Sequence, residues 1–125
     1  MKITAFNPLI LSNKADEAVE LFEALGFEHA HTKEAIEGHV TSYDLKYGED
    51  FRVDVATVDK FPQDLTVIRM NVRDFDEAYQ FLLSKGFKPA REDGSTTKTS
   101  SSEDTLMFSP SGFAINLIQH IRNHD

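Results

Sequence analysis

The side chains that could do chemistry in this sequence are its histidines, carboxylates and arginines, because no cysteine is present. Thiolate nucleophiles, disulfides and Cys-based metal sites are therefore excluded, and a metal ion would need His, Asp or Glu. His29 and His31 lie two residues apart on one predicted strand, and His39 lies near the start of the next. Three imidazoles that converge across this hairpin could hold zinc. The charged neighbours Glu28 and Lys33 favour the alternative, a solvated hairpin, so we keep the histidines only as an alternative metal site.

Other catalytic arrangements are missing from the sequence. It contains no Gly-rich phosphate loop and no Gly-x-Ser-x-Gly nucleophile motif. The serines at 100–102 have no predicted His and Asp partners nearby. No catalytic residue is assigned, and we lean toward a protein that is not an enzyme.

Length and charge restrict the class of protein further. The 125 residues suffice for one small domain, and 13 Lys and Arg against 21 Asp and Glu give a net charge of −8. A negative surface repels phosphate backbones and anionic lipids, so nucleic acid and membranes are poor partners, whereas a neutral or cationic small molecule is compatible. No apolar stretch reaches the length of a signal or membrane segment, and we expect a cytoplasmic protein.

The elements that must position these residues occur twice. Residues 16–30 align with residues 76–90 at an offset of 60 without a gap, and six of the 15 pairs are identical, against roughly one expected from average composition. Two unrelated helices that each end in glycine would explain the residue types but not the matched register. The chain is thus one domain of two repeated modules, 1–60 and 61–125.

Each module is predicted to contain a strand, a helix and three further strands. Gly26 and Gly86 end the helices, and Asp74 is the expected N-cap of the second. The apolar residues at helical spacing are Ala18, Leu21, Phe22 and Leu25 in the first helix, and Phe75, Ala78, Tyr79 and Leu82 in the second. The predicted strands are 6–11, 27–32, 40–46 and 51–58, then 65–72, 87–91, 105–108 and 113–118.

Two polar segments interrupt this order. Residues 59–64 contain a proline and are typical of a linker between the modules. Residues 91–104 form either a mobile lid or a long solvated hairpin, and the hairpin is favoured because such ends are common.

Three segments resemble the vicinal oxygen chelate superfamily, which includes glyoxalase I, extradiol dioxygenases and bleomycin-resistance proteins. They are 22–27, which ends in Gly26-Phe27, the helix start at 74–78, and the turn and last strand at 109–118, where Ser109 replaces the family's usual Asp. The resemblance spans almost the whole chain. It implies an α+β fold in which two tandem βαβββ modules enclose a shared cleft with their curved mixed sheets, and it implies a homodimer. A tandem ferredoxin-like βαββ protein is the alternative, against which the extra strand counts.

In that family a divalent ion can be held by one residue from the first and last strands of each module. The matching positions here are Asn7, Asp54, Val67 and Asn116. Valine cannot coordinate a metal, and two neutral amides with one carboxylate are a weak ligand set. We therefore expect no cofactor and no metal, unless the ligand positions are misaligned.

Alternation along the strands assigns further residues to the cleft. If those four positions face the cleft, so do their neighbours two residues away. The predicted ligand-binding face consists of Asn7, Leu9, Leu11, Arg52, Asp54, Val67, Arg69, Asn71, Asn116 and Ile118. The opposite, helix-covered faces then receive nine apolar residues, namely Phe51, Val53, Val55, Ile68, Met70, Val72, Phe113, Ile115 and Leu117.

Three functional hypotheses remain open. The leading one is a metal-free protein of the glyoxalase and bleomycin-resistance type that binds a small molecule in the cleft for sequestration or sensing, with a cationic ligand favoured by the net charge. The second is a metal-dependent lyase or dioxygenase of the same superfamily. The third is an interaction module in which Arg52, Asp54 and Arg69 neutralise one another and fill the cleft, since buried charges are often paired for structural reasons.

Overall fold

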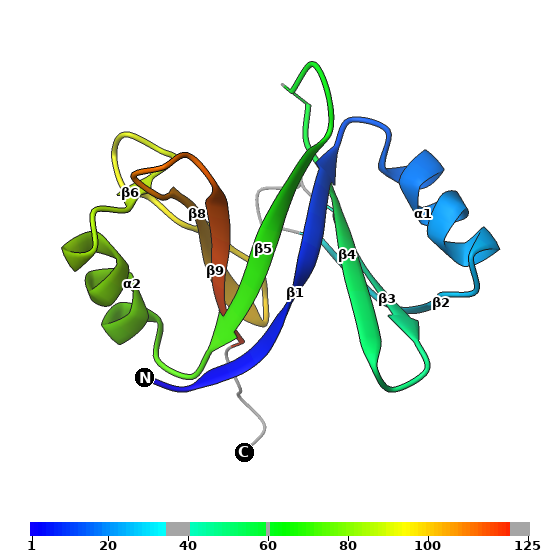
Figure 1. Cartoon of the computed structure of the whole chain (residues 1–125), viewed down its shortest axis with the longest axis horizontal. Coiled ribbons are helices and arrows are strands. Elements are labelled where there is room, and N and C mark those ends of the chain that lie inside the picture. The colour runs from blue at the N-terminus through cyan, green and yellow to red at the C-terminus, as the bar shows by residue number, and fades with distance from the viewer. Residues whose placement is uncertain (35–40, 60, 121–125) are drawn as a thin grey trace. The chain divides into compact units, whose positions relative to one another are not determined.

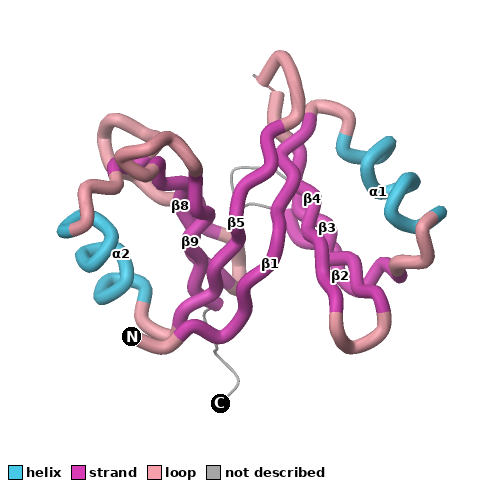
Figure 2. Tube along the Cα trace, in the orientation of Figure 1, coloured by secondary structure: helices cyan, strands magenta, loops and turns pink. Residues whose placement is uncertain are grey.

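The computed structural model describes residues 1–34, 41–59 and 61–120 and divides into two compact units (Figure 1). The first unit comprises residues 7–66, and the second comprises residues 1–6 together with residues 67–125. Each unit contains one helix and its own set of strands (Figure 2). The N-terminal segment belongs to the second unit, where the backbone N–H of Arg73 donates to the carbonyl of Lys2 at 3.0 Å.

The first unit is a βαβββ module. Its strands have the order β2-β3-β4-β1, with β1 parallel to β4 and the other pairs antiparallel. A single helix precedes β2. The elements are β1 (Ile3–Ser12), α1 (Ala15–Ala24), β2 (Glu28–Glu34), β3 (Thr41–Tyr47) and β4 (Phe51–Thr57).

The second unit repeats this arrangement. Its strands have the order β5-β9-β8-β6, with β5 parallel to β9 and the short β7 paired to β8. The elements are β5 (Leu65–Val72), α2 (Phe75–Ser84), β6 (Lys88–Pro89), β7 (Thr97–Lys98), β8 (Ser102–Phe108) and β9 (Ala114–His120). The predicted α+β fold of two tandem βαβββ modules is confirmed, while the shared cleft stays a prediction.

The two helices lie 60 residues apart and end in the same way. After α1, the N–H of Phe27 donates to the carbonyl of Phe22 at 3.0 Å, and after α2 the N–H of Phe87 donates to that of Leu82 at 3.0 Å. This turn needs a left-handed residue, which Gly26 and Gly86 supply with φ of 110° and 93°. Each helix has ten residues, about half of what a bilayer requires, and none in the described ranges could cross a membrane.

The helix starts differ between the units. The side chain of Asp74 accepts a hydrogen bond from the N–H of Glu77 at 3.1 Å, which confirms it as the N-cap of α2. The equivalent residue of α1 is Lys14, whose side chain makes no capping bond. Ser12 instead accepts the N–H of Lys14 at 2.9 Å.

Each helix covers an apolar face of its sheet. The second core contains the predicted stripe of α2 together with Met70, Val72, Met107, Ile115 and Leu117. In α1 the predicted stripe was partly wrong, because Leu21 and Leu25 are 57% and 59% exposed. The core of the first unit instead contains Ala15, Ala18, Val19 and Phe22, packed with Leu45, Val53 and Val55. Phe51 and Phe113 also depart from the expected helix-covered set, because both are exposed, Phe51 at the start of β4 and Phe113 just before β9.

The polar segment at 91–104 contains a hairpin, as favoured from the sequence. Thr97 and Lys98 of β7 pair with Asp104 and Glu103 of β8. Several strand predictions were wrong at their ends. The first strand begins at Ile3 instead of 6. The strand predicted at 87–91 is reduced to Lys88–Pro89, and β8 begins at Ser102 instead of 105.

Candidate functional site

The first unit has a polar sheet face that points away from its helix. Leu9 on β1 is the Cα partner of Asp54 on β4, so Asn7, Leu9 and Leu11 share a face with Asp54. The residues that alternate with them lie under α1, namely Ile10, Val53 and Val55. The structure therefore brings together four of the residues predicted to bind a ligand.

A carboxylate and an amide meet at the centre of this face. Asn7 donates through Nδ2 to Oδ2 of Asp54 at 3.1 Å and to the backbone carbonyl of Pro8 at 2.9 Å. Asp54 is only 4% exposed. Removing a carboxylate from water is costly, and the hydrogen bond from Asn7 offsets part of that cost.

The second unit has an equivalent face. Arg69 on β5 is the Cα partner of Asn116 on β9, and both point away from the core that packs under α2. Val67, Asn71 and Ile118 share this face by alternation. The assignment of these five residues to one face follows the prediction.

Polar side chains on this face form a relay. Arg69 donates through Nε to Oδ1 of Asn116 at 2.9 Å, and Asn116 donates through Nδ2 to Oδ2 of Asp104 at 2.7 Å. Arg69 and Asn116 are 8% and 5% exposed. The amide thus links a guanidinium to a carboxylate, each bond being charge-assisted.

Sequence reasoning missed Asp104. It was placed at the end of a solvated loop, whereas the structure extends β8 back to Ser102 and pairs Asp104 with Ile118. The signal in the sequence was the alternation of Asp104 with Leu106 and Phe108, which places the carboxylate in register with the predicted strand.

Asn71 carries an unsatisfied acceptor. Its Oδ1 is buried and accepts no hydrogen bond from any residue that the structure describes. A buried carbonyl without a donor costs stability, so this oxygen is a place where a water molecule or a ligand donor would be favourable.

The residues at the family's metal positions do not fit a divalent ion. Val67 has no donor atom, and Asn116 already uses its oxygen to accept from the cationic Arg69. A metal ion bound to Asn116 would have to approach the positively charged guanidinium of Arg69, which repels it. In the first unit, the side-chain N–H of Asn7 donates to Oδ2 of Asp54, so this oxygen is less available as a metal ligand.

Arg52 is the exception among the predicted residues. It lies on the same sheet face as Asp54, opposite Lys46, but its side chain is exposed. Arg52 is therefore not buried as Asp54 and Arg69 are. This difference weakens the hypothesis that these three side chains neutralise one another.

The alternative metal site at His29, His31 and His39 stays a prediction. The pairing of β2 with β3 shifts register between His29 and His31. His29 lies beside the ring of Tyr43, at a centroid distance of 5.8 Å, and His39 lies outside the described residues. Among the side chains that the structure describes, which do not include those of His31 and His39, no three His, Asp or Glu are grouped as a metal site.

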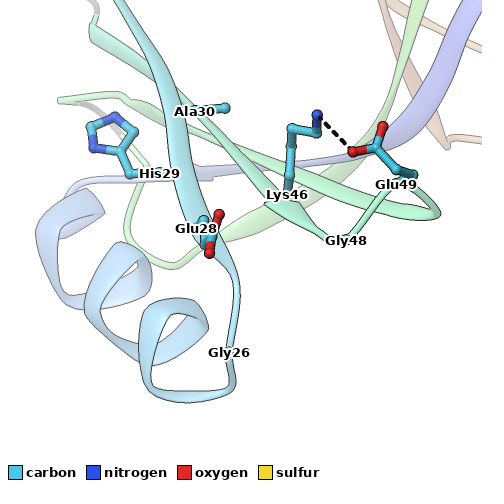
Figure 3. Close-up of a pocket in the computed structure, with 7 residues that line it drawn as sticks. All are labelled: Gly26, Glu28, His29, Ala30, Lys46, Gly48 and Glu49. Atoms are coloured by element: carbon cyan, nitrogen blue, oxygen red, sulfur yellow. Dashed lines mark ion pairs between the residues drawn. The ribbon is translucent and has the colours of Figure 1, made fainter.

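A separate hollow of about 330 Å³ lies in the first unit (Figure 3). It is lined by Gly26, Glu28, His29 and Ala30 at the start of β2 and by Lys46, Gly48 and Glu49 at the β3–β4 turn. Nothing in the sequence analysis assigned these residues together. No residue type in the sequence signals this hollow, because its lining is brought together by the pairing of β2 with β3.

Comparisons with known proteins give the fold but no close relative. No protein-family model matches the sequence, and no curated protein matches it. Among solved structures, methylmalonyl-CoA epimerase from Mycobacterium tuberculosis matches with a TM-score of 0.68 at 16% identity, over 94% of this chain and 88% of that one. A hypothetical protein from Bacillus halodurans C-125 matches with a TM-score of 0.71 at 10% identity, over 100% and 99%.

A third match is a glyoxalase/bleomycin resistance protein/dioxygenase superfamily member from Vibrio splendidus 12B01, with a TM-score of 0.53 at 16% identity, over 94% of this chain and 99% of that one. Identities this low show the fold alone. These matches cover nearly the whole chain and show that it shares their fold. The chain has the fold of the vicinal oxygen chelate superfamily.

Proposed function

We propose that the protein binds a small organic molecule through the polar faces of its sheets, without a metal ion, and thereby sequesters or senses that molecule. The observation that carries this proposal is the burial of Asp54, Arg69 and Asn116 on faces that point away from the helices. Buried charges cost stability, and apolar residues of similar size would often serve a fold equally well. Side chains of this kind are frequent at functional sites.

The chemistry of the two faces suggests the kind of ligand. The Arg69–Asn116–Asp104 relay offers both signs of charge, and Oδ1 of Asn71 is an acceptor that needs a donor. Apolar contact would come from Leu9, Leu11, Val67 and Ile118, which are all buried. A partly apolar molecule with hydrogen-bond donors fits this combination, and the net charge of −8 favours a cation.

The structural neighbours support binding of a small molecule in a general way. One is named as an epimerase of a coenzyme A ester, and another as a glyoxalase/bleomycin resistance protein/dioxygenase superfamily member. Metal-dependent lyase or dioxygenase chemistry is the weaker alternative for this chain, because Val67 and the Arg69-bound Asn116 do not suit a divalent ion.

A melting experiment tests the proposal. Thermal unfolding is followed with a panel of small compounds that includes a basic glycopeptide, aromatic amines, neutral amides and carboxylic acids. We expect at least one compound to raise the melting temperature in a saturable way. Amide resonances of Arg69, Asn71 and Asn116, or of Asn7 and Asp54, should shift on titration with it.

A matched pair of variants checks the location. Arg69→Met removes the guanidinium from the polar face, whereas Arg73→Met changes the exposed arginine that directly follows β5. The ligand-induced rise should vanish in the first variant and persist in the second. A rise that survives in both, or a ligand that shifts only resonances elsewhere, would contradict the proposed site.

A further inference from the structure

The polar face of the second unit is organised as two neighbouring rows of residues that run across its strands. One row contains Arg69 on β5 and its Cα partner Asn116 on β9. The next row contains Asn71 on β5, its partner Ile118 on β9, and Asp104, the partner of Ile118 on β8. Successive residues on one face of a strand lie about 7 Å apart, so one small molecule can contact both rows.

The two rows differ in their chemistry. The first row presents a cation, because the guanidinium of Arg69 carries several N–H donors and uses Nε to donate to Asn116 at 2.9 Å. The second row presents two acceptors, the carboxylate of Asp104 and Oδ1 of Asn71, on either side of Ile118. Ile118 itself is buried and offers apolar contact between them.

A single carboxamide separates the two opposite charges of this face. Asn116 accepts from Arg69 and donates to Oδ2 of Asp104 at 2.7 Å. A ligand group that carries only one charge therefore meets a like charge nearby as well as an opposite one. A molecule with a carboxylate and an ammonium group a short distance apart matches both signs at once.

Asn71 supplies an independent indication that a ligand brings a donor. Its Oδ1 is buried and receives no hydrogen bond from the described part of the chain, although the residue as a whole is partly exposed. The χ2 torsion of asparagine is broad, so the side chain can turn this oxygen toward the open part of the face. An ammonium group has several N–H donors and can serve both Asn71 and Asp104.

The first unit does not repeat this arrangement. The offset of 60 places Leu9 and Leu11 at the positions equivalent to Arg69 and Asn71, and both leucines are buried. These positions carry neither a guanidinium nor an amide. The combination of groups is therefore specific to the second unit.

We propose that the polar face of the second unit binds a zwitterion, namely a free α-amino acid with an apolar side chain. The carboxylate of this ligand accepts from Arg69, and its ammonium group donates to Asn71 and Asp104. Its side chain contacts Val67 and Ile118, which are both buried.

This inference rests on the proposed function and narrows its ligand to one class. The net charge of −8 attracts a cation at long range, but a ligand in contact with the face meets both signs of charge.

Three compounds that share one aromatic group and differ in charge test the inference. The ¹⁵N-labelled protein is titrated with L-phenylalanine, with 2-phenylethylammonium, which lacks the carboxylate, and with 3-phenylpropanoate, which lacks the ammonium group. We expect saturable shifts of the amides of Arg69, Asn71 and Asn116 with phenylalanine. The other two should bind about tenfold more weakly, the factor for loss of one charge-assisted contact.

A second amino acid controls for the fit of the side chain. L-leucine should shift the same amides as L-phenylalanine, because the apolar contact requires no aromatic ring. Two outcomes would overturn the inference: no saturable binding of either amino acid at these residues, or equal binding of phenylalanine and one of its singly charged analogues.

Variants separate recognition from folding. Arg69→Met and Asn71→Leu should each weaken binding of L-phenylalanine about tenfold, whereas Arg73→Met and Asn13→Leu, at exposed residues outside the face, should leave it unchanged. Asn71→Asp keeps an acceptor oxygen and should retain most of the affinity. An unchanged affinity in both Arg69→Met and Asn71→Leu, each with a folded spectrum, would contradict the proposal.

A stability measurement distinguishes a binding role of Asn71 from a structural one. Asn71→Leu removes a buried oxygen that has no donor, so the urea midpoint should stay the same or rise. A lower midpoint would show that a bound water or a protein group satisfies this oxygen without a ligand, and would remove Asn71 from the proposed site.

The failure of this inference can be told apart from the failure of the proposed function. If neither amino acid binds while another compound of the melting panel shifts the amides of Arg69 and Asn116, the zwitterion is wrong and the proposed function stands. If no compound of either set shifts a residue of the polar faces, both are wrong.

Discussion

At the scale of single residues, the molecule is distinguished by polar side chains that are buried and satisfied locally. Asn116 accepts from Arg69 and donates to Asp104, so its amide is held in one orientation by two charged neighbours. Asn7 holds Asp54 in a similar way. Such pairs position groups on a sheet face more precisely than isolated side chains would, which suits recognition of a small ligand.

Arg69→Met should lower the free energy of unfolding by about 1–3 kcal/mol, because Oδ1 of Asn116 loses its donor while it remains buried. The double variant Arg69→Met with Asn116→Leu should lose less than the sum of the two single variants, since no unsatisfied amide is then left. Denaturation with urea measures all four proteins of this cycle. Strictly additive losses would show that the two side chains are not coupled.

At the scale of elements, the repeat places equivalent strands and one helix in each unit, and these elements position the polar faces. Much of this could be predicted, because the period of 60 residues, the helix-ending Gly26 and Gly86 and the alternation on β5 are local patterns. The stripe of α1 was misassigned because 18, 21, 22 and 25 also have helical spacing. The offset of 60 from Phe75, Ala78, Tyr79 and Leu82 would have indicated 15, 18, 19 and 22, which pack in the core.

Other features could not be read from one sequence. The register shift between His29 and His31 is a backbone irregularity with no residue signature there. The hollow beside Gly48 depends on the pairing of β2 with β3, whose register one sequence does not reveal. Asp104 was missed because polar residues at a strand end resemble those of a loop.

The capping of the two helices gives a test at this scale. Asp74→Ala should destabilise the protein by about 1 kcal/mol, because the N–H of Glu77 loses its acceptor. Lys14→Ala is the matched change at α1 and should have little effect, since its side chain makes no capping bond. Equal losses in urea denaturation would show that the side-chain cap of α2 contributes nothing.

The glycines of the second unit allow a second test. Gly86→Ala and Gly112→Ala impose the same backbone strain, with φ of 93° and 107°, but only the first adds a Cβ that meets Pro110. We expect Gly86→Ala to be the more destabilising by about 1–3 kcal/mol, the usual cost of overpacking. The difference should diminish in a Pro110→Ala background, and its persistence there would contradict the contact.

At the scale of the whole molecule, the chain exposes several large apolar side chains, among them Phe6, Leu25, Phe51 and Phe113. Exposed apolar surface is often covered by a partner. In keeping with the resemblance, we predict a homodimer. Light scattering after size exclusion should give twice the 14.1 kDa of one chain, and a mass of one chain at all concentrations would contradict it.

We expect this chain to bind its ligand without a metal ion. Metal content is measured by mass spectrometry on tag-free protein, after incubation with zinc, nickel, manganese and ferrous iron and removal of unbound ions. We predict no stoichiometric retention, because Val67 offers no donor and Asn116 is bound to Arg69. Retention of one ion per chain, lost on Asp54→Ala, would contradict the claim and favour a metal-dependent enzyme.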